Sequence, residues 1–154
     1  MKTNYFIIPL ITILTAVIGS WLTNIQSVWY NSLSFPWFTP PGWVIGLAWT
    51  IIFILTMISA LIVWQQEKKS KLLFFIGLIF VFNAVLNIFW SWLFFNQHLI
   101  APAIIEAACL GVSVVLLIAL IAPISRLAAW LLAPYAFWVA FATYLTYSIW
   151  LLNF

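Results

Sequence analysis

The chain has 154 residues, of which 68% are hydrophobic and only 5% are charged, and its formal net charge is +3. A soluble domain carries charge on about a quarter of its residues, so this composition excludes a soluble globular protein and indicates an integral membrane protein. The single cysteine, Cys109, excludes a disulfide framework within the chain and a cysteine-based metal cluster.

Five apolar runs are each long enough to cross a bilayer, which takes about 20 residues in helical form. The alternating ten-residue segments that are typical of a membrane β-barrel do not occur. The first run starts near the N-terminus, but it is long and no A-x-A cleavage site follows it, so we interpret it as a helix rather than a signal peptide. The sequence therefore predicts an all-α membrane protein with one domain, residues 1–154, and five transmembrane helices, at about 5–23, 44–64, 72–94, 99–122 and 127–150.

The basic residues lie on one side of this predicted bundle. Five alternating spans place the N-terminus, the loop 65–71 and the turn before the last helix on the same side, and these segments carry Lys2, Lys68, Lys69, Lys71 and Arg126. Because cytoplasmic loops carry an excess of Lys and Arg, the pattern predicts a multi-pass cell-membrane protein with a cytoplasmic N-terminus. The same distribution argues against a nucleic-acid partner.

The predicted outer loop, residues 24–43, has an unusual composition. Pro36, Pro40 and Pro41 oppose a regular helix, because proline lacks a backbone N–H and fixes its own φ. The loop carries no charge and contains six aromatic residues, Trp29, Tyr30, Phe35, Trp37, Phe38 and Trp43. A stiff, aromatic and uncharged loop between two spans predicts a lid over an apolar site.

The second and third predicted helices carry residues with a four-residue spacing. Trp49 and Phe53 share one face of the second helix, and Asn83, Asn87 and Ser91 form a polar stripe on the third. A carboxamide in hydrocarbon must find a partner, because an unpaired polar group there is costly. For Asn83 we expect an interhelical hydrogen bond; for Asn87, such a bond and a ligand contact both remain open.

The fourth predicted helix contains Glu106, the only acidic residue within a span. An ionisable residue inside a membrane is a candidate for function, and the alternative is that Glu106 lies near enough to the outer end to reach water. Ala103, Ala107 and Gly111 form a small-residue face, which predicts close packing against another helix or a second protomer.

The fifth predicted helix contains Pro134, which should bend the helix and free the carbonyl of Trp130. Trp138 lies near the middle of the span, too deep for the interfacial belt that tryptophan usually occupies. One turn outward, Ala142 leaves space beside it.

The predicted orientation brings groups from four helices to a similar depth in the outer half of the membrane. These groups are Trp49, Asn87, Trp90, Glu106, Cys109, Trp138 and Ala142. A mostly apolar pocket with a few polar groups is the usual form of a small-molecule site, and tryptophan rings offer broad faces to a flat ligand. Hydrolytic chemistry is not indicated, because the sole histidine lies in an outer turn and neither a Ser-His-Asp set nor a metal-binding constellation is present.

Three segments resemble the signatures of one known family. They are WYNSLSFPWFTPPGWVIGLAW at residues 29–49, NAVLNIFWSWLFF at residues 83–95 and AWLLAPYAFWVAFATYL at residues 129–145. They look like the motifs of the translocator protein family (TspO/MBR), also called tryptophan-rich sensory proteins and, in animals, peripheral benzodiazepine receptors. The match covers about residues 29–153, in order and at family-like spacing.

The resemblance implies a five-helix bundle that is usually a homodimer and that binds porphyrins, such as protoporphyrin IX and haem, and isoquinoline and benzodiazepine drugs. It implies Trp49 and Trp138 as pocket tryptophans. Other pocket-lining positions of the family match Tyr30, Pro41, Phe53, Asn87, Trp90 and Ala142, and the residue analysis adds Asn83, Glu106 and Cys109 as further candidates. Beyond a porphyrin or haem ligand, we expect no required cofactor and no metal ligand.

The chain departs from the family at its C-terminal end. Many members have Leu-Asn where this chain has Leu145 and Thr146, and the ending SIWLLNF lacks the basic cholesterol motif of animal members. We therefore expect a bacterial plasma membrane rather than a mitochondrial outer membrane.

The function that we expect is a membrane receptor or transporter for tetrapyrroles, with its pocket in the outer half of the bundle. Two alternatives remain open. One is an enzyme that degrades protoporphyrin IX in light, as some bacterial members are reported to do, with Trp49 and Trp138 as the reacting side chains. The other is a structural or regulatory membrane subunit whose tryptophans only pack.

Overall fold

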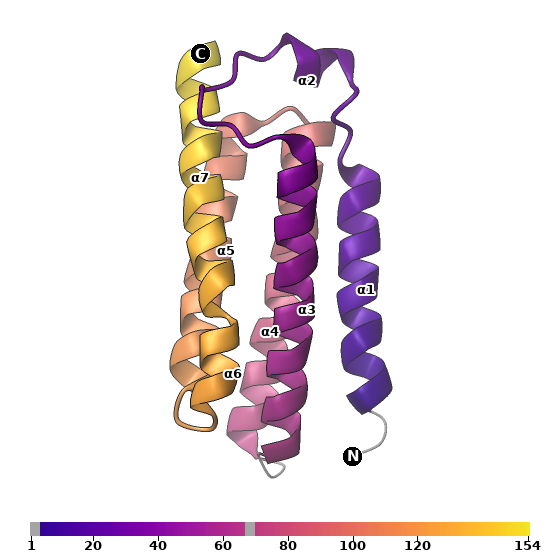
Figure 1. Cartoon of the computed structure of the whole chain (residues 1–154), viewed down its shortest axis with the longest axis vertical. Helices are drawn as coiled ribbons and strands as arrows, with labels where there is room; N and C mark the ends of the chain where they lie inside the picture. Colours follow the sequence, from indigo (N-terminus) through magenta and orange to yellow (C-terminus); the bar gives the residue numbers. More distant parts are fainter. Residues whose placement is uncertain (1–3, 67–69) are drawn as a thin grey trace.

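The computed structural model describes residues 4–66 and 70–154, and within these ranges the chain is all-helical with no strand. Its elements in order are α1 (Asn4–Leu22), α2 (Val28–Ser32), α3 (Gly42–Gln66), α4 (Lys71–Ser91), the π-helical turn η1 (Trp92–Asn96), α5 (Ile100–Ile121), α6 (Arg126–Leu131) and α7 (Ala133–Asn153). The long helices stand side by side along one axis, with the N-terminus at the lower end and the C-terminus at the upper end (Figure 1). The predicted all-α fold class is confirmed.

Five helical segments of the described ranges are long and apolar enough to cross a membrane. Three of them are α1, α3 and α5; α4 continues through η1 as another, and α6 continues into α7 as the last. The prediction of five membrane-spanning helices is therefore confirmed, and the chain is a multi-pass membrane protein.

The last span is interrupted just before Pro134, as predicted. α6 and α7 are separated at Leu132, whose backbone N–H bonds to the Ala129 carbonyl at 3.1 Å. Proline at position 134 has no N–H to donate to the carbonyl of Trp130, so the regular helical ladder cannot continue through this point. The interruption lies directly beside Tyr135, a buried residue of the candidate site described below.

The upper end of α4 widens into the π-helical turn η1. The Gln97 N–H bonds to the Trp92 carbonyl at 3.0 Å, and Leu93, Phe94 and Phe95 are all buried. π-turns within helices are frequent at functional sites. Here the turn buries a group of aromatic side chains directly below the outer loop.

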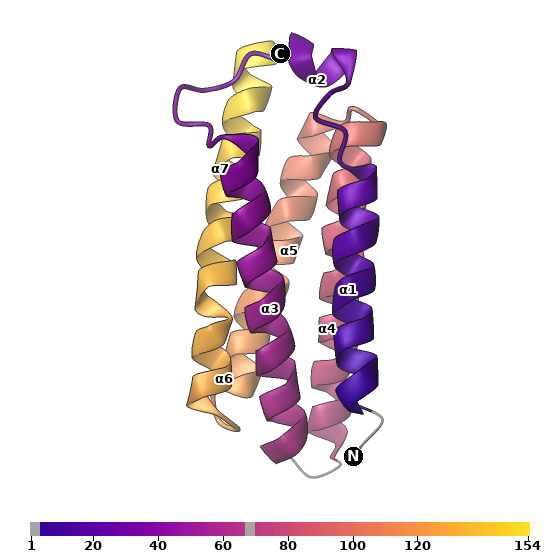
Figure 2. The same ribbon diagram turned by 45° about the vertical axis from the view of Figure 1, so that its right-hand side comes forward.

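α5 is packed against both α4 and α7. Its Ala103 and Ala107 are buried, and a Cβ added to Gly111 would lie only 3.4 Å from Cγ1 of Val139 on α7. The small-residue face predicted on this helix therefore meets another helix of the same chain at Gly111. α1, by contrast, lies at the side of the bundle, is largely exposed and contacts α3 and α4 (Figure 2).

The outer loop crosses the upper end of the bundle and contains α2, a short helix that the sequence analysis does not predict (Figure 1). α2 precedes the three prolines, so their effect on the backbone begins after it. Ser27 stabilises its start, because the Ser27 Oγ accepts a hydrogen bond from the Tyr30 N–H at 3.1 Å.

Aromatic and polar contacts fasten this loop to the bundle. The ring of Trp29 stacks on His98, with 4.1 Å between centroids and an interplanar angle of 15°. At the end of α7, the side chain of Asn153 accepts from the Ser34 N–H at 2.9 Å and donates to the Ser34 carbonyl at 3.0 Å. The loop is therefore held over the upper end by contacts with the His98 turn and with α7.

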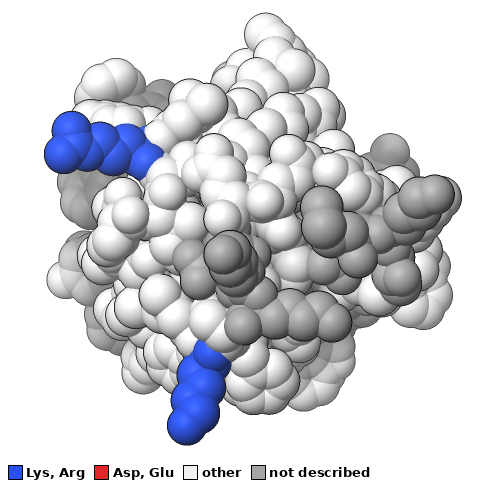
Figure 3. All heavy atoms as spheres, turned by 90° about the horizontal axis from the view of Figure 1, so that it is seen from below, with Lys and Arg blue, Asp and Glu red and all other residues white. Residues whose placement is uncertain are grey.

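The described basic residues lie at the opposite, lower end. Lys71 begins α4 and Arg126 begins α6, and Figure 3 shows the blue Lys and Arg side chains on this lower face. This arrangement matches the clustering that the predicted cytoplasmic side requires. Lys2, Lys68 and Lys69, on which the same prediction rests, lie outside the described residues.

Candidate ligand-binding site

A network of hydrogen bonds crosses the middle of the bundle. Asn83 Nδ2 donates to Ser113 Oγ at 2.8 Å, and the Tyr135 hydroxyl donates to Asn83 Oδ1 at 3.0 Å. Asn87 Nδ2 donates to the same Tyr135 oxygen at 3.3 Å, and all four side chains are buried. The interhelical hydrogen bond expected for Asn83 is confirmed, and Asn87 makes one as well.

Tyr135 is a site residue that the sequence analysis misses. A signal was available, because two carboxamides within a span must find partners. Tyr135 carries a phenol in the middle part of the last span, at a depth from which it can reach them. In the sequence, the neighbouring Pro134 indicates a helix bend at this point and gives no sign of a site residue.

Trp49 and Trp138 pack against one buried cluster in the middle of the bundle, formed by Ile52, Leu110, Val114, Tyr135 and Val139. The Trp49 ring lies 5.9 Å from the Tyr135 ring, edge to face, and 5.8 Å from the Phe53 ring. The structure thus brings the two candidate pocket tryptophans to the same part of the core, next to the polar network.

Tyr30 and Trp90 lie higher, in an aromatic cluster beneath the outer loop. Trp90 stacks on Phe94 with 5.1 Å between centroids, and Tyr30 lies 5.6 Å from Phe95 and 4.9 Å from Phe35 of the loop. Burial raises the pKa of the Tyr30 phenol above its ordinary value, so this group is neutral at physiological pH. The loop and the upper end of α4 therefore contribute rings to one continuous cluster.

Five buried polar side-chain atoms of the described residues have no hydrogen-bond partner. One is Thr56 Oγ1, and the other four are Trp90 Nε1, Trp138 Nε1 and the two carboxyl oxygens of Glu106. Because buried polar groups in native proteins are nearly always paired, each exception calls for a specific explanation. Four of these atoms belong to residues that the sequence analysis selects as ligand-binding candidates.

Trp90 and Glu106 lie at a similar height on the neighbouring helices α4 and α5. The hydrogen bond between Asn83 and Ser113 sets the register of these two antiparallel helices. Trp90 lies two turns above Asn83 and Glu106 two turns above Ser113, and residues at this spacing share one helix face. Glu106 is only 6% exposed, so its carboxyl group lies inside the bundle and not in water at its outer end.

Three further candidates lie apart from these contacts. Pro41 precedes α3, where its carbonyl accepts from the Val44 N–H at 2.9 Å. Ala142 is half-buried on α7, one turn above Trp138. Cys109 is exposed on α5, so its thiol does not join the buried groups.

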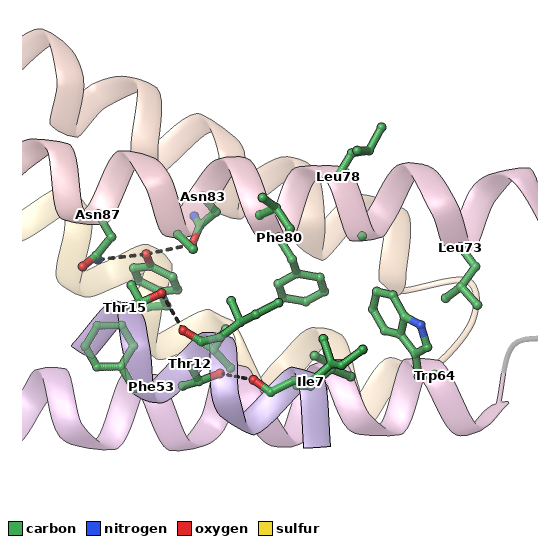
Figure 4. A pocket seen from close by; sticks show the side chains of 18 of the residues that line it. Ile7, Thr12, Thr15, Phe53, Trp64, Leu73, Leu78, Phe80, Asn83 and Asn87 are labelled. Carbon is green, nitrogen blue, oxygen red and sulfur yellow. Dashed lines mark hydrogen bonds between the residues drawn. The ribbon is translucent and has the colours of Figure 1, made fainter. Parts of the chain in front are cut away.

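A cavity of about 590 Å³ lies between α1, α3 and α4, and we call it the lower cavity. Figure 4 shows it extending from Asn87 and Thr15 at one end to Trp64 and Leu73 at the other. It therefore begins at the central polar network and runs toward the lower end of the bundle, whereas the predicted pocket lies in the upper half.

Three sequence candidates line the lower cavity, namely Phe53, Asn83 and Asn87. Asn87 thus combines the two roles that the sequence left open for it, an interhelical bond and a position on a cavity wall. The threonines and Trp64 of this cavity were not anticipated. Their signal was weak, since isolated threonines and a tryptophan at a span end are common in membrane helices.

The chemistry of these groups suits binding. Buried rings can stack on a flat molecule, while carboxamide, indole N–H and carboxyl groups can form hydrogen bonds with it. In residues 4–66 and 70–154, no three His, Cys, Asp or Glu side chains lie close enough together to hold a metal ion.

Comparison with known proteins agrees with this architecture. The sequence profile of the TspO/MBR family matches residues 7–151. The chain is 33% identical over 154 residues to the tryptophan-rich protein TspO of Bacillus cereus, covering 99% of each chain. It is 37% identical over 141 residues to the TspO of Archaeoglobus fulgidus, covering 88% of this chain and 87% of the relative. The translocator protein of Homo sapiens is 29% identical over 126 residues, covering 79% of this chain and 73% of the human one.

Proposed function

Because the chain belongs to the TspO/MBR family of membrane proteins, we propose that it is a receptor or transporter for porphyrins, such as protoporphyrin IX or haem. Flat isoquinoline and benzodiazepine-type molecules are the second class of ligand. Two relatives are named tryptophan-rich sensory protein and translocator protein, which supports a role in sensing or translocation. The similarity to a Bacillus cereus protein agrees with the predicted location in a bacterial plasma membrane.

The observation that carries this proposal is the set of unpartnered polar atoms in Trp90, Trp138 and Glu106. In a membrane interior, a buried group without a partner destabilises the folded chain. Three such residues between the middle and the outer end of the bundle therefore contribute something other than stability, and ligand binding is the contribution that fits an indole N–H and a carboxyl group.

The surrounding residues indicate the kind of ligand. Trp49, Trp138 and Phe53 present rings to a flat apolar body, while the indole N–H groups require an acceptor and the Glu106 carboxyl can pair with a donor. The loop fastened above by Asn153 would shield such a ligand from water. In this proposal the side chains repack to admit the ligand, since the polar atoms are closed off in the present conformation.

The test is a titration of the purified protein with protoporphyrin IX in the dark, followed by the absorbance of the porphyrin. We expect saturable binding that Trp138→Phe and Trp90→Phe each weaken about three- to tenfold, because each removes one hydrogen bond and part of a stacking surface. Trp130→Phe is the matched control, since Trp130 is 74% exposed on α6 and should leave the affinity unchanged.

An absence of saturable protoporphyrin IX binding would contradict the proposed function. Saturable binding that responds to none of the buried tryptophans would place the ligand elsewhere and remove the outer-half site. If Trp138→Phe does not fold, Trp90→Phe decides the question, because the phenyl ring keeps the stack on Phe94.

A further inference from the structure

The lower cavity is not accounted for by the proposed outer-half site. It extends to Trp64 and Leu73 near the lower end of α3 and α4, far from the outer loop (Figures 1 and 4). Part of its wall is open at the side: Phe74 is 70% exposed and Leu78 is 50% exposed. Because these residues belong to a membrane-spanning helix, the cavity opens laterally to lipid.

The polar groups of the lower cavity gather at its inner end. Thr12 and Thr15 of α1, Thr56 of α3 and Asn83 of α4 line it near the middle of their helices, and Asn87 lines it one turn above Asn83. The opposite end is apolar. Among the described residues that form the wall, none is Asp, Glu, Lys or Arg.

Most hydrogen-bond donors at the inner end of the lower cavity already have a partner, whereas acceptor lone pairs there do not. Thr12 and Thr15 donate their hydroxyl hydrogens to carbonyls one turn earlier, at 3.0 and 2.8 Å, as the dashed lines in Figure 4 show. Asn83 and Tyr135 use their donors within the central network. A hydroxyl oxygen keeps two lone pairs after donating, and Thr56 Oγ1 has no partner within the described chain.

This polarity is the reverse of that of a phospholipid lying beside the helices. A phospholipid keeps its polar head at the interface and ends its acyl chains at the bilayer centre, where this cavity is polar. An acyl chain would cover these oxygens without bonding to them, which is unfavourable. A charged group would also be unfavourable there, because the wall offers no opposite charge.

We propose that the lower cavity is a second binding site, for an uncharged, mostly apolar molecule that enters from the lipid with an O–H or N–H donor at its buried end. The donor group is accepted by Thr15 and, after a side-chain rotation that turns its closed-off Oγ1 into the cavity, by Thr56, and the apolar body extends toward Trp64. The volume of about 590 Å³ lies within the range of small-molecule sites, roughly 300–1,000 Å³.

The experiment compares two fluorescent probes, 1-hydroxypyrene and 1-methoxypyrene, which share a ring system and differ in one donor. The full chain is reconstituted in lipid nanodiscs, and saturable energy transfer from tryptophan to pyrene is measured, with empty nanodiscs correcting for partition into lipid. We expect 1-hydroxypyrene to bind about five- to tenfold more tightly than the methyl ether, the effect of one hydrogen bond.

Variants then locate the probe. Ala84→Phe fills the cavity and should abolish the saturable signal, whereas Val85→Phe on the neighbouring lipid-facing position, 57% exposed, should keep it. The double variant Thr15→Val with Thr56→Val keeps the shape of both side chains and should reduce the preference for the hydroxyl probe at least threefold.

Binding that survives Ala84→Phe and is lost in Trp138→Phe would put the probe in the outer half and overturn the proposal. The proposal would also be overturned if the Thr15→Val, Thr56→Val double variant kept the full preference for 1-hydroxypyrene over 1-methoxypyrene. This comparison remains informative even if Ala84→Phe does not fold. The outcome of the pyrene experiment does not depend on that of the porphyrin titration, because neither Thr15 nor Thr56 belongs to the outer-half candidates.

Discussion

Buried polar side chains in this protein fall into two groups with opposite effects on stability. Asn83 and Asn87 of α4 bond to Tyr135 of α7, and Asn83 also bonds to Ser113 of α5. The Trp90 indole N–H on α4 and the Glu106 carboxyl group on α5 are buried without a hydrogen-bond partner among the described residues. In hydrocarbon a paired group holds helices together while an unpaired one costs free energy, so the first group stabilises the fold and the second indicates function.

Tyr135→Phe tests the stabilising group. The change removes the oxygen that bridges the two asparagines and leaves each carboxamide one partner short, so we expect a loss of about 2 kcal/mol in the free energy of unfolding. The measurement is thermal unfolding in detergent, where the midpoint should fall by several degrees. Tyr144→Phe is the control, because Tyr144 is 59% exposed; equal midpoints for the two variants would show that the network contributes no stability.

Among the elements, the outer loop shows how a segment without a long helix becomes ordered. Its prolines limit the backbone conformations that it can adopt, and its aromatic side chains pack on η1 and the upper end of α4. The bond pair between Asn153 and Ser34 adds a polar contact to the last turn of α7. The position of the loop therefore depends on η1 and on the last turn of α7, and a change in that turn of α7 reaches the loop directly.

Asn153→Ala removes both hydrogen bonds to Ser34 while leaving the aromatic contacts in place. We expect amide hydrogen exchange in residues 29–41 to become roughly fivefold faster, the effect of about 1 kcal/mol. Ser148→Ala on the same helix is the control, since its hydroxyl bonds only to the Tyr144 carbonyl. If both variants exchange at the wild-type rate, the loop is held by its rings alone.

At the scale of the whole molecule, two regions suited to ligands lie at different depths and share a wall. Tyr135 contacts Trp49 on the side of the outer-half candidates, and it also lines the lower cavity. The described basic residues mark the end nearer to the lower cavity (Figure 3). The homodimer that the family resemblance implies stays a prediction.

The orientation in the membrane can be measured directly. In a Cys109→Ser background, His98→Cys should react with a membrane-impermeant maleimide in intact cells, because His98 lies in the predicted outer turn. Arg126→Cys should react only after permeabilisation, since the positive-inside pattern places it in the cytoplasm. Both positions are exposed, and the reverse labelling pattern would invert the topology.

Much of the fold could be predicted from the sequence because it depends on local composition. Apolar length sets where a chain crosses a bilayer, and the structure confirms all five spans. A proline in a helix interior removes one backbone hydrogen bond and clashes with the preceding turn, which favours the break before Pro134, although α1 continues through Pro9. The motifs around Trp49, Asn87 and Trp138 are contiguous segments, so they too indicated the family from the sequence alone.

The tertiary structure alone decided which side chains meet. α3 and α4 are apolar on nearly every side, so no sequence period specifies how each helix is rotated about its axis or aligned with its neighbour. That rotation brings Tyr135 to Asn83 and leaves the lower cavity between α1, α3 and α4. The sequence by itself determined a five-helix membrane protein of this family, and the packing of the helices determined its sites, because packing depends on contacts between residues far apart in the chain.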